Sequence, residues 1–231
     1  MTNLRPLSTC SRTTTLRTHH HGGDDEGFTL IELMVVLLVI AILLAIAIPT
    51  FLGVSTSAND RAAQSNLTNA LTEAKALYQN TQTYNSGSLP QATFAASAPE
   101  FSWTQNGACS SGGTSCVSEY PVDVQSSGDG RAMILASLSK TGTCWYVVDL
   151  ESAPSSTSFT DSGGGATYQF LSGTTTAGTA PQTQQMGGSA LTSAGVYYAK
   201  KTTSTCNAST PVTETTASWK WGTSYSSAGS D

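Results

Sequence analysis

The hydrophobic residues of this 231-residue chain are concentrated in one block near the N-terminus. The run from Phe28 to Ile48 reads FTLIELMVVLLVIAILLAIAI and carries one charge, Glu32. As a helix, these 21 residues would be about 31 Å long, which matches a hydrocarbon core of about 30 Å. The block has no polar face, so it predicts a membrane-spanning helix rather than one that lies on the membrane surface.

After Pro49 polar residues predominate, and the apolar ones return at steps of three or four. They form one stripe of a helix: Leu67, Ala70, Leu71, Ala74, Leu77 and Tyr78. Residues 55–80 hold no proline and no glycine, so we predict one helix from Phe28 to about Asn80. Pro49 and Gly53 should kink it or melt it locally. The apolar stripe of its second half would pack against a sheet.

Residues 81–231 alternate short β-prone runs with stretches rich in Gly, Ser and Thr. Two runs, 131–139 and 144–150, are separated by Lys-Thr-Gly-Thr and predict a hairpin. Further strands are expected at 166–171, 196–200 and 217–221, and exposed loops at 151–165 and 172–194. The predicted fold is α+β, with a long N-terminal helix packed on an antiparallel sheet of about four strands.

Composition narrows the classes of function. Charged residues make up 11% of the chain, against roughly 25% in an ordinary soluble domain, and the net charge of −5 excludes a basic footprint for nucleic acid. All three histidines stand at 19–21, before the apolar block. If that segment is removed, no Ser-His-Asp or Cys-His catalytic site and no His-ligated metal site is possible. We therefore predict no enzyme, no cofactor and no metal.

Glu32 is unusual, because an acidic residue inside a membrane span is costly and by default marks function. It ends the sequence Gly27-Phe28-Thr29-Leu30-Ile31-Glu32, which is followed by the apolar block and Pro49. This pattern resembles the N-terminus of type IV prepilins, which have Gly before the cleavage site. Counted from Phe28, Glu32 is fifth and Pro49 twenty-second, as in that family. The acidic residues 24–26 replace the basic ones usual before the cut, an arrangement similar to Gram-positive, especially actinobacterial, pilins.

The resemblance implies four segments, which are a leader that is removed (1–27), a transmembrane and polymerisation helix (28–48), its amphipathic continuation (49–80) and a β head domain (81–231). A prepilin peptidase would cut between Gly27 and Phe28 and methylate the new amine. In the filament, the Glu32 carboxylate would pair with the Phe28 amine of a neighbouring subunit and fix the register.

The implied function is that of a structural subunit of a type IV pilus-like filament that serves adhesion, motility or DNA uptake. The subunit would be stored in the cell membrane with its N-terminus in the cytoplasm, and then assembled into an extracellular pilus. Its partners would be other copies of itself, the prepilin peptidase, the platform protein and ATPase of the assembly machinery, and membrane lipid. No sequence feature indicates nucleic-acid binding.

Three alternatives stay open. A pseudopilin of a type II secretion system has the same N-terminus, but the acidic calcium loop near its C-terminus has only Asp231 as a counterpart here. A signal peptidase cut after Ala47, in the small-x-small triplet 45–47, would release a secreted binding module. A membrane-anchored enzyme is disfavoured by the lack of a mature histidine, a Gly-rich phosphate loop and a clustered acidic pair.

Loss of the leader removes Cys10 and leaves an even number of cysteines: Cys109, Cys116, Cys144 and Cys206. They should face outside, where an oxidising location favours disulfides, and three connectivities are possible. We favour Cys109–Cys116, which closes a short loop, together with Cys144–Cys206. A metal site is the weaker interpretation, because there is no CxxC pair.

Two weaker motifs remain. Asp123 and Gly128-Asp129-Gly130 suggest a calcium loop, but a turn before the strand at 131 is the favoured interpretation. Asn207-Ala208-Ser209 is a sequon for N-glycosylation, a triplet that also arises by chance in chains rich in Ser and Thr.

Overall fold

The computed structural model describes residues 27–84, 90–113, 115–126, 128–156, 168–172, 183–186, 189–214 and 219–230. It divides the chain into an N-terminal unit, Met1–Ile48, and a head unit, Pro49–Asp231. The predicted leader, with Cys10 and the histidines, lies outside the described residues except for Gly27.

The structure is α+β, as the sequence predicts. Its helices are α1 (Leu30–Thr81), α2 (Pro90–Ser97), α3 (Thr210–Thr213) and the 3-10 turn η1 (Tyr225–Ser227). Its strands are β1 (Ser102–Gln105), β2 (Cys116–Asp123), β3 (Ala132–Leu138), β4 (Thr143–Leu150), β5 (Tyr168–Gln169), β6 (Leu171–Ser172), β7 (Thr183–Met186), β8 (Ser189–Ala190), β9 (Gly195–Thr202), β10 (Trp219–Trp221) and β11 (Gly229–Ser230).

Helix α1 was expected to be kinked or locally melted at Pro49 and Gly53, and the structure contradicts the local melting. It is unbroken through Pro49 and Gly53, although proline removes one backbone hydrogen bond from the ladder. The carbonyl oxygen of Gly53 accepts hydrogen bonds from the side chains of Thr56, at 2.9 Å, and Ser57, at 3.3 Å. The bond that Pro49 cannot make is the one to the carbonyl of Ala45, and the loss of this single bond does not interrupt the helix.

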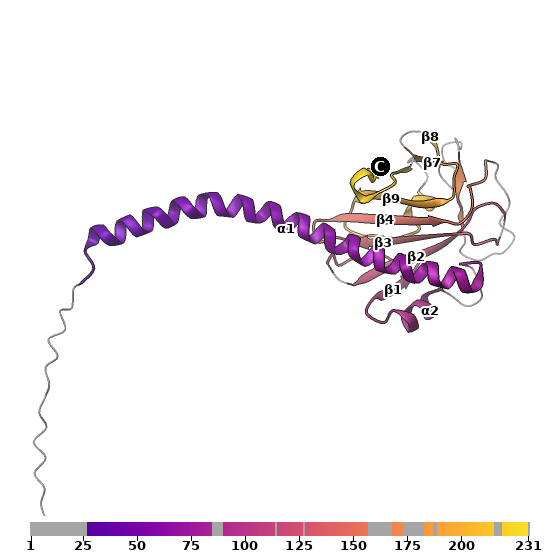
Figure 1. The fold of residues 1–231 in the computed structure, drawn as a ribbon, viewed down its shortest axis with the longest axis horizontal. Helices are drawn as coiled ribbons and strands as arrows, with labels where there is room; N and C mark the ends of the chain where they lie inside the picture. The colour runs from indigo at the N-terminus through magenta and orange to yellow at the C-terminus, as the bar shows by residue number, and fades with distance from the viewer. Residues whose placement is uncertain are drawn as a thin grey trace, which may run out of the picture. The chain divides into compact units, whose positions relative to one another are not determined.

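The main sheet has the order β1-β2-β3-β4-β9-β11, with β5 also paired to β2. Its centre, β2-β3-β4-β9, is antiparallel and includes the predicted hairpin as β3 and β4. The flanking strands β1, β5 and β11 pair in parallel, so the sheet is mixed and larger than the four strands expected. In Figure 1, α1 crosses the face of this sheet and α2 lies next to β1.

Strand β2 was not among the predicted strands, because Glu119 and Pro121 interrupt its apolar pattern. Pro121 is tolerated since it lies between the part of β2 that pairs with β1 and the part that pairs with β5. The expectation that the segment 172–194 is an exposed loop is also wrong. It contains β7 and β8, and it buries Leu191.

Both faces of the main sheet are covered, which explains why β3 is buried at every position. The α1 face packs the apolar stripe of the helix against alternate strand residues: Ala63, Leu67, Ala70, Leu71 and Ala74 with Val117, Met133, Leu135, Trp145 and Val147. The opposite face packs Ile134, Tyr146 and Val148 against the two tryptophans of β10. Strand β10 belongs to a second small sheet, β10-β7-β6 with β8.

A buried polar contact fastens the end of α1 to the sheet. Asp149 of β4 has 2% of its side chain exposed, and its carboxylate lies 3.3 Å from Nζ of Lys75. The hydroxyl of Tyr84, just after the helix, donates to the same carboxylate at 2.8 Å. Burial beside Asp149 strongly raises the pKa of Tyr84, so this phenol stays protonated and keeps donating.

Tyr84→Phe should lower the free energy of unfolding by about 1.5–3 kcal/mol, because it removes a hydrogen bond to a charged group. Tyr197→Phe is the matched control, since its hydroxyl donates to the neutral carbonyl of Ser193 at 3.1 Å, a bond that contributes about 0.5–1.5 kcal/mol. Urea titration of the full chain in detergent measures both. A larger loss for Tyr197→Phe would contradict this role of Asp149.

The two disulfides are Cys109–Cys116 and Cys144–Cys206, the pairs that the sequence favours. They meet in space, because Cys109 and Cys206 exchange two backbone hydrogen bonds, of 2.8 and 3.0 Å. The loop before β2 is thereby linked to β4 through the segment after β9.

Removing the longer link should destabilise the head unit more than removing the shorter one. In the loop-entropy model, closing 62 residues contributes about 4 kcal/mol and closing 7 residues about 2.5 kcal/mol. Thermal unfolding of the double variants Cys144→Ser/Cys206→Ser and Cys109→Ser/Cys116→Ser compares them directly. A smaller loss for the first pair would show that strain or residual structure outweighs loop closure.

Candidate functional site

The start of α1 is built by a reciprocal hydrogen-bonded cap. Thr29 precedes the first helical residue, and its hydroxyl oxygen accepts the backbone N–H of Glu32 at 3.3 Å. In return, Oε2 of Glu32 accepts both the backbone N–H and the hydroxyl of Thr29, each at 2.9 Å. This is a capping box, which satisfies amide groups that a helix start otherwise leaves without partners.

The cap adds a residue that the sequence interpretation missed. Thr29 was quoted only as part of the motif, yet Thr-x-x-Glu before an apolar run is itself a helix-start signal. Glu32 therefore has a local structural role besides its predicted role between subunits. Within an apolar environment the cap matters more, because no water replaces the bonds it makes.

Gly27 and Phe28 lie just ahead of this cap. A Cβ placed on Gly27 would meet no atom of the described residues within 4 Å, so packing within that part of the chain does not require glycine there. The side chain of Phe28 is 87% exposed. Any constraint on these two positions therefore comes from a partner and not from packing within the described chain.

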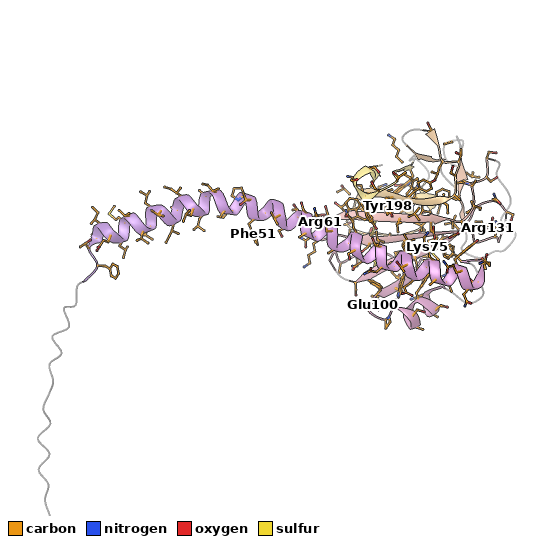
Figure 2. All side chains as sticks on the ribbon, viewed as in Figure 1. Phe51, Arg61, Lys75, Glu100, Arg131 and Tyr198 are labelled. Carbon is orange, nitrogen blue, oxygen red and sulfur yellow. A yellow bond between two sulfur atoms is a disulfide. The ribbon has the colours of Figure 1, made fainter. Side chains whose placement is uncertain are left out.

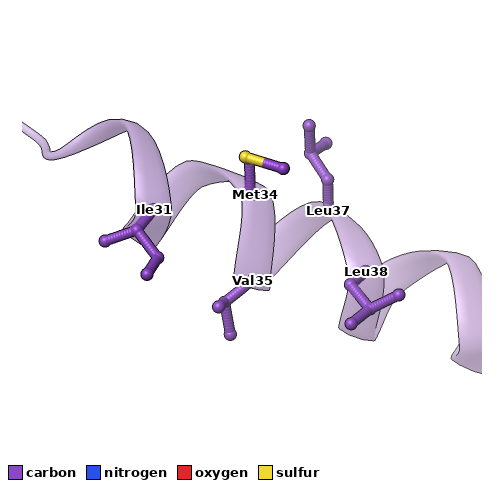
Figure 3. Close-up of a pocket in the computed structure, with 5 residues that line it drawn as sticks. All are labelled: Ile31, Met34, Val35, Leu37 and Leu38. Atoms are coloured by element: carbon purple, nitrogen blue, oxygen red, sulfur yellow. The ribbon is translucent and has the colours of Figure 1, made fainter.

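The apolar side chains that follow are left exposed by the part of the chain that the structure describes. The large ones between Leu30 and Val54 are each at least 45% exposed. Figure 3 shows five of them pointing to different sides of the first turns: Ile31, Met34, Val35, Leu37 and Leu38. Farther on, Phe51 projects freely from α1 (Figure 2). Such a surface needs lipid or other apolar helices around it.

Pro49, the predicted assembly residue in the head unit, lines a shallow groove along α1. The groove is made of small residues and ends at Arg61: Pro49, Thr50, Gly53, Val54, Ser57, Ala58 and Arg61.

The suspected calcium loop is a turn. Asp129 accepts the backbone N–H groups of Val124, Gln125 and Ser126 at 2.7–3.0 Å. Asp123 accepts those of two glycines, 128 and 130. Both carboxylates are thus engaged by backbone donors. Within the ranges that the structure covers, no three His, Cys, Asp or Glu side chains are grouped to hold a metal ion.

The sequon at Asn207 is also part of a turn. Its side-chain oxygen accepts the backbone N–H and the hydroxyl of Ser209, each at 3.0 Å, and its amide donates to the carbonyl of Asn106 at 3.2 Å. These bonds stabilise the turn, and they explain the presence of Asn and Ser at these two positions without any glycan.

Comparison with known proteins agrees with the site. Among the described residues, α1 is long and apolar enough to cross a membrane, with a mean hydropathy of 3.2 in its most apolar 18-residue stretch. Residues 24–48 match the family model of the prokaryotic N-terminal methylation motif, the signature of type IV prepilins. No curated protein and no solved structure matches the chain. The chain thus carries the N-terminus of a pilin-like or pseudopilin precursor, which fits a membrane-anchored protein.

Proposed function

We propose that this protein is a structural subunit of a type IV pilus-like filament. It is made with a leader, which prepilin peptidase removes by cleaving the bond between Gly27 and Phe28. Before assembly it is stored in the membrane as a single-pass protein. It then polymerises through α1 and exposes its head unit on the filament surface. We infer a structural role and not a catalytic one.

One observation supports this proposal most directly. A capped, otherwise apolar helix follows a glycine that the fold does not need, and its side chains have no cover within the described chain. A peptidase explains the glycine, and packing of the helices of other copies explains the bare apolar surface. The carboxylate of Glu32 offers about four acceptor sites, so two capping bonds leave room for the Phe28 amine of a neighbour.

The mature N-terminus tests this proposal against the signal-peptide alternative. Mass spectrometry of protein sheared from the cell surface should find N-methylated Phe28 as the first residue. A first residue of Ile48 would instead indicate a cut after Ala47 and a released head without α1's apolar part, which would overturn the filament role.

A pseudopilin is the second candidate, because the methylation motif is common to both kinds of precursor. Electron microscopy of a strain lacking this chain discriminates between them. Loss of surface filaments supports the pilin, whereas intact filaments together with a defect in protein secretion support the pseudopilin. We infer that a surface filament of this protein would act in adhesion, motility or DNA uptake. Each of these activities can be measured in the same deletion strain.

A further inference from the structure

Glu119 is a buried carboxyl group without a partner. It lies in β2, opposite Gln105 of β1 on one side and Leu135 of β3 on the other. Its side chain is 0% exposed, and within the described part of the chain neither carboxyl oxygen has a hydrogen-bond partner. A buried polar group of this kind is rare in folded proteins, and it calls for an explanation.

The group points into the layer between the sheet and the helices. Side chains two apart on a strand share a face, so Glu119 faces the same side as Val117, which packs in the core that includes α1. The edge of this layer is closed by residues 90–105, which contain α2 and β1 and are here called the α2–β1 flank. Only four residue pairs join β1 to β2.

Aromatic packing gives the flank its own integrity. Phe94 of α2 stacks on Trp103 of β1 with ring centroids 4.5 Å apart. Gln91 donates from its side chain to the carbonyl of Trp103 at 3.0 Å. The pairing that joins the flank to β2 is short, but Phe94, Phe101 and Trp103 pack in the same core as α1 and the sheet, so opening the flank exposes these aromatic side chains.

No neighbouring element supplies Glu119 with a compensating charge. The sequences of α2, β1 and β3 contain no ionisable side chain. The charged side chains of the remaining elements in this layer are Asp60, Arg61, Glu73 and Lys75 of α1, Asp149 of β4 and Lys200 of β9, with Glu100 exposed on the flank itself. Asp60 is bonded to Thr141, and Lys75 lies beside Asp149. Burial, the one cause at work, raises the pKa of Glu119 to about 8.

We propose that Glu119 is a proton-controlled latch. As a neutral acid it lets the α2–β1 flank close over β2, and when it loses its proton the carboxylate draws in water and releases the flank. The sites used for cleavage and assembly take no part in this device, so it stands or falls separately from the proposed function.

The direction of the effect follows from proton linkage. The closed head unit holds the proton up to about pH 8, whereas an opened flank restores the ordinary pKa of 4.5. Between these values the closed form binds more protons than the open form, so closure is favoured at low pH and weakens as pH rises. Within that window the opening equilibrium constant should increase about tenfold per pH unit, and above it the constant should level off.

Hydrogen–deuterium exchange of the full chain in detergent tests the latch. Peptides covering 90–105 are compared at pH 6.5 and pH 9 in wild type and in Glu119→Gln, because the intrinsic pH dependence of amide exchange is the same in both proteins and cancels in their ratio. Relative to Glu119→Gln, wild-type protection of the flank should fall at least about tenfold between the two pH values. For peptides of β9, the ratio of wild-type protection to Glu119→Gln protection should be the same at both pH values.

Glu100→Gln is the matched control, because it removes an exposed carboxylate from the same flank. It should behave as wild type. In the variant Glu119→Met, whose new side chain has no group that gains or loses a proton, the flank should stay closed at both pH values. This variant replaces Glu119→Gln as the reference if Glu119→Gln does not fold. Equal protection in wild type and the Glu119 variants at both pH values would overturn the latch. So would a loss of protection in β9 together with the flank, since that is global unfolding.

Discussion

Gly27→Glu should abolish processing, leaving a precursor 27 residues longer than the mature chain in the membrane fraction. The reason is access, since a peptidase must bring its own groups close to the backbone at Gly27, and only glycine leaves that space empty. Gly27→Leu should fail in the same way without adding charge, and Gly27→Ala should be processed poorly. Immunoblots of membrane fractions resolve the two lengths.

Gly53 provides the matched control for this prediction. A Cβ there also meets no atom of the described residues within 4 Å, and the residue lies in α1 well beyond the predicted cleavage site. Gly53→Glu should therefore be cut like wild type, whatever it does to later steps. Mature protein in wild-type amount from Gly27→Glu would show that cleavage does not take place at this bond.

The long helix could be predicted because its signals are local. An uninterrupted apolar block and a stripe at three- and four-residue steps need no knowledge of the rest of the chain. Pro49 and Gly53 misled the prediction of melting, because each weakens the helix at one position only, while the backbone bonds on either side of it are kept. The capping bond of Thr29 was equally local and could have been found.

The sheet was less readable, since both of its faces are buried. A strand covered on two sides shows no alternation of apolar and polar residues, and β2 even contains a glutamate and a proline. The short strands β7 and β8 consist of Thr, Gln, Ser and Ala with one Met, a composition typical of loops. Strand β7 pairs with β10, more than thirty residues away along the chain, and β8 in turn pairs with β7.

The buried polar groups could not be predicted from sequence either. Tyr84 and Asp149 are 65 residues apart and become partners only through the fold. Glu119 reads as an ordinary surface glutamate until β1, β3 and the helices close around it. Long-range packing decides the environment of such groups, and so it decides their chemistry.

Glu32→Ala should leave cleavage intact and remove most filaments. The cut needs Gly27 and the backbone beside it, and the variant helix is more apolar, so membrane storage is not impaired. The variant lacks both functions of the carboxylate, which are the capping bonds to Thr29 and the predicted pairing with the Phe28 amine of a neighbour. Immunoblots of sheared filament and membrane fractions measure the distribution.

Magnitudes indicate which of the two functions limits assembly. Loss of an N-terminal cap costs about 1 kcal/mol. A charge left unpaired in a low-dielectric core costs about 3–5 kcal/mol, and here the unpaired charge would be the amine of the next subunit. At 1.4 kcal/mol per factor of ten, the second penalty weakens each addition step at least about 100-fold. It recurs with every subunit, so the pairing and not the cap should decide filament yield.

Two further variants separate these functions experimentally. Glu32→Gln keeps an oxygen that can accept the capping bonds but has no charge, so it should assemble as poorly as Glu32→Ala. Thr29→Ala removes the hydroxyl that takes part in the cap and keeps the Glu32 charge, so it should lose only a minor share of filaments. If Glu32→Gln gave wild-type yield while Glu32→Ala gave none, assembly would depend on the helix cap, and the pairing between subunits would be refuted.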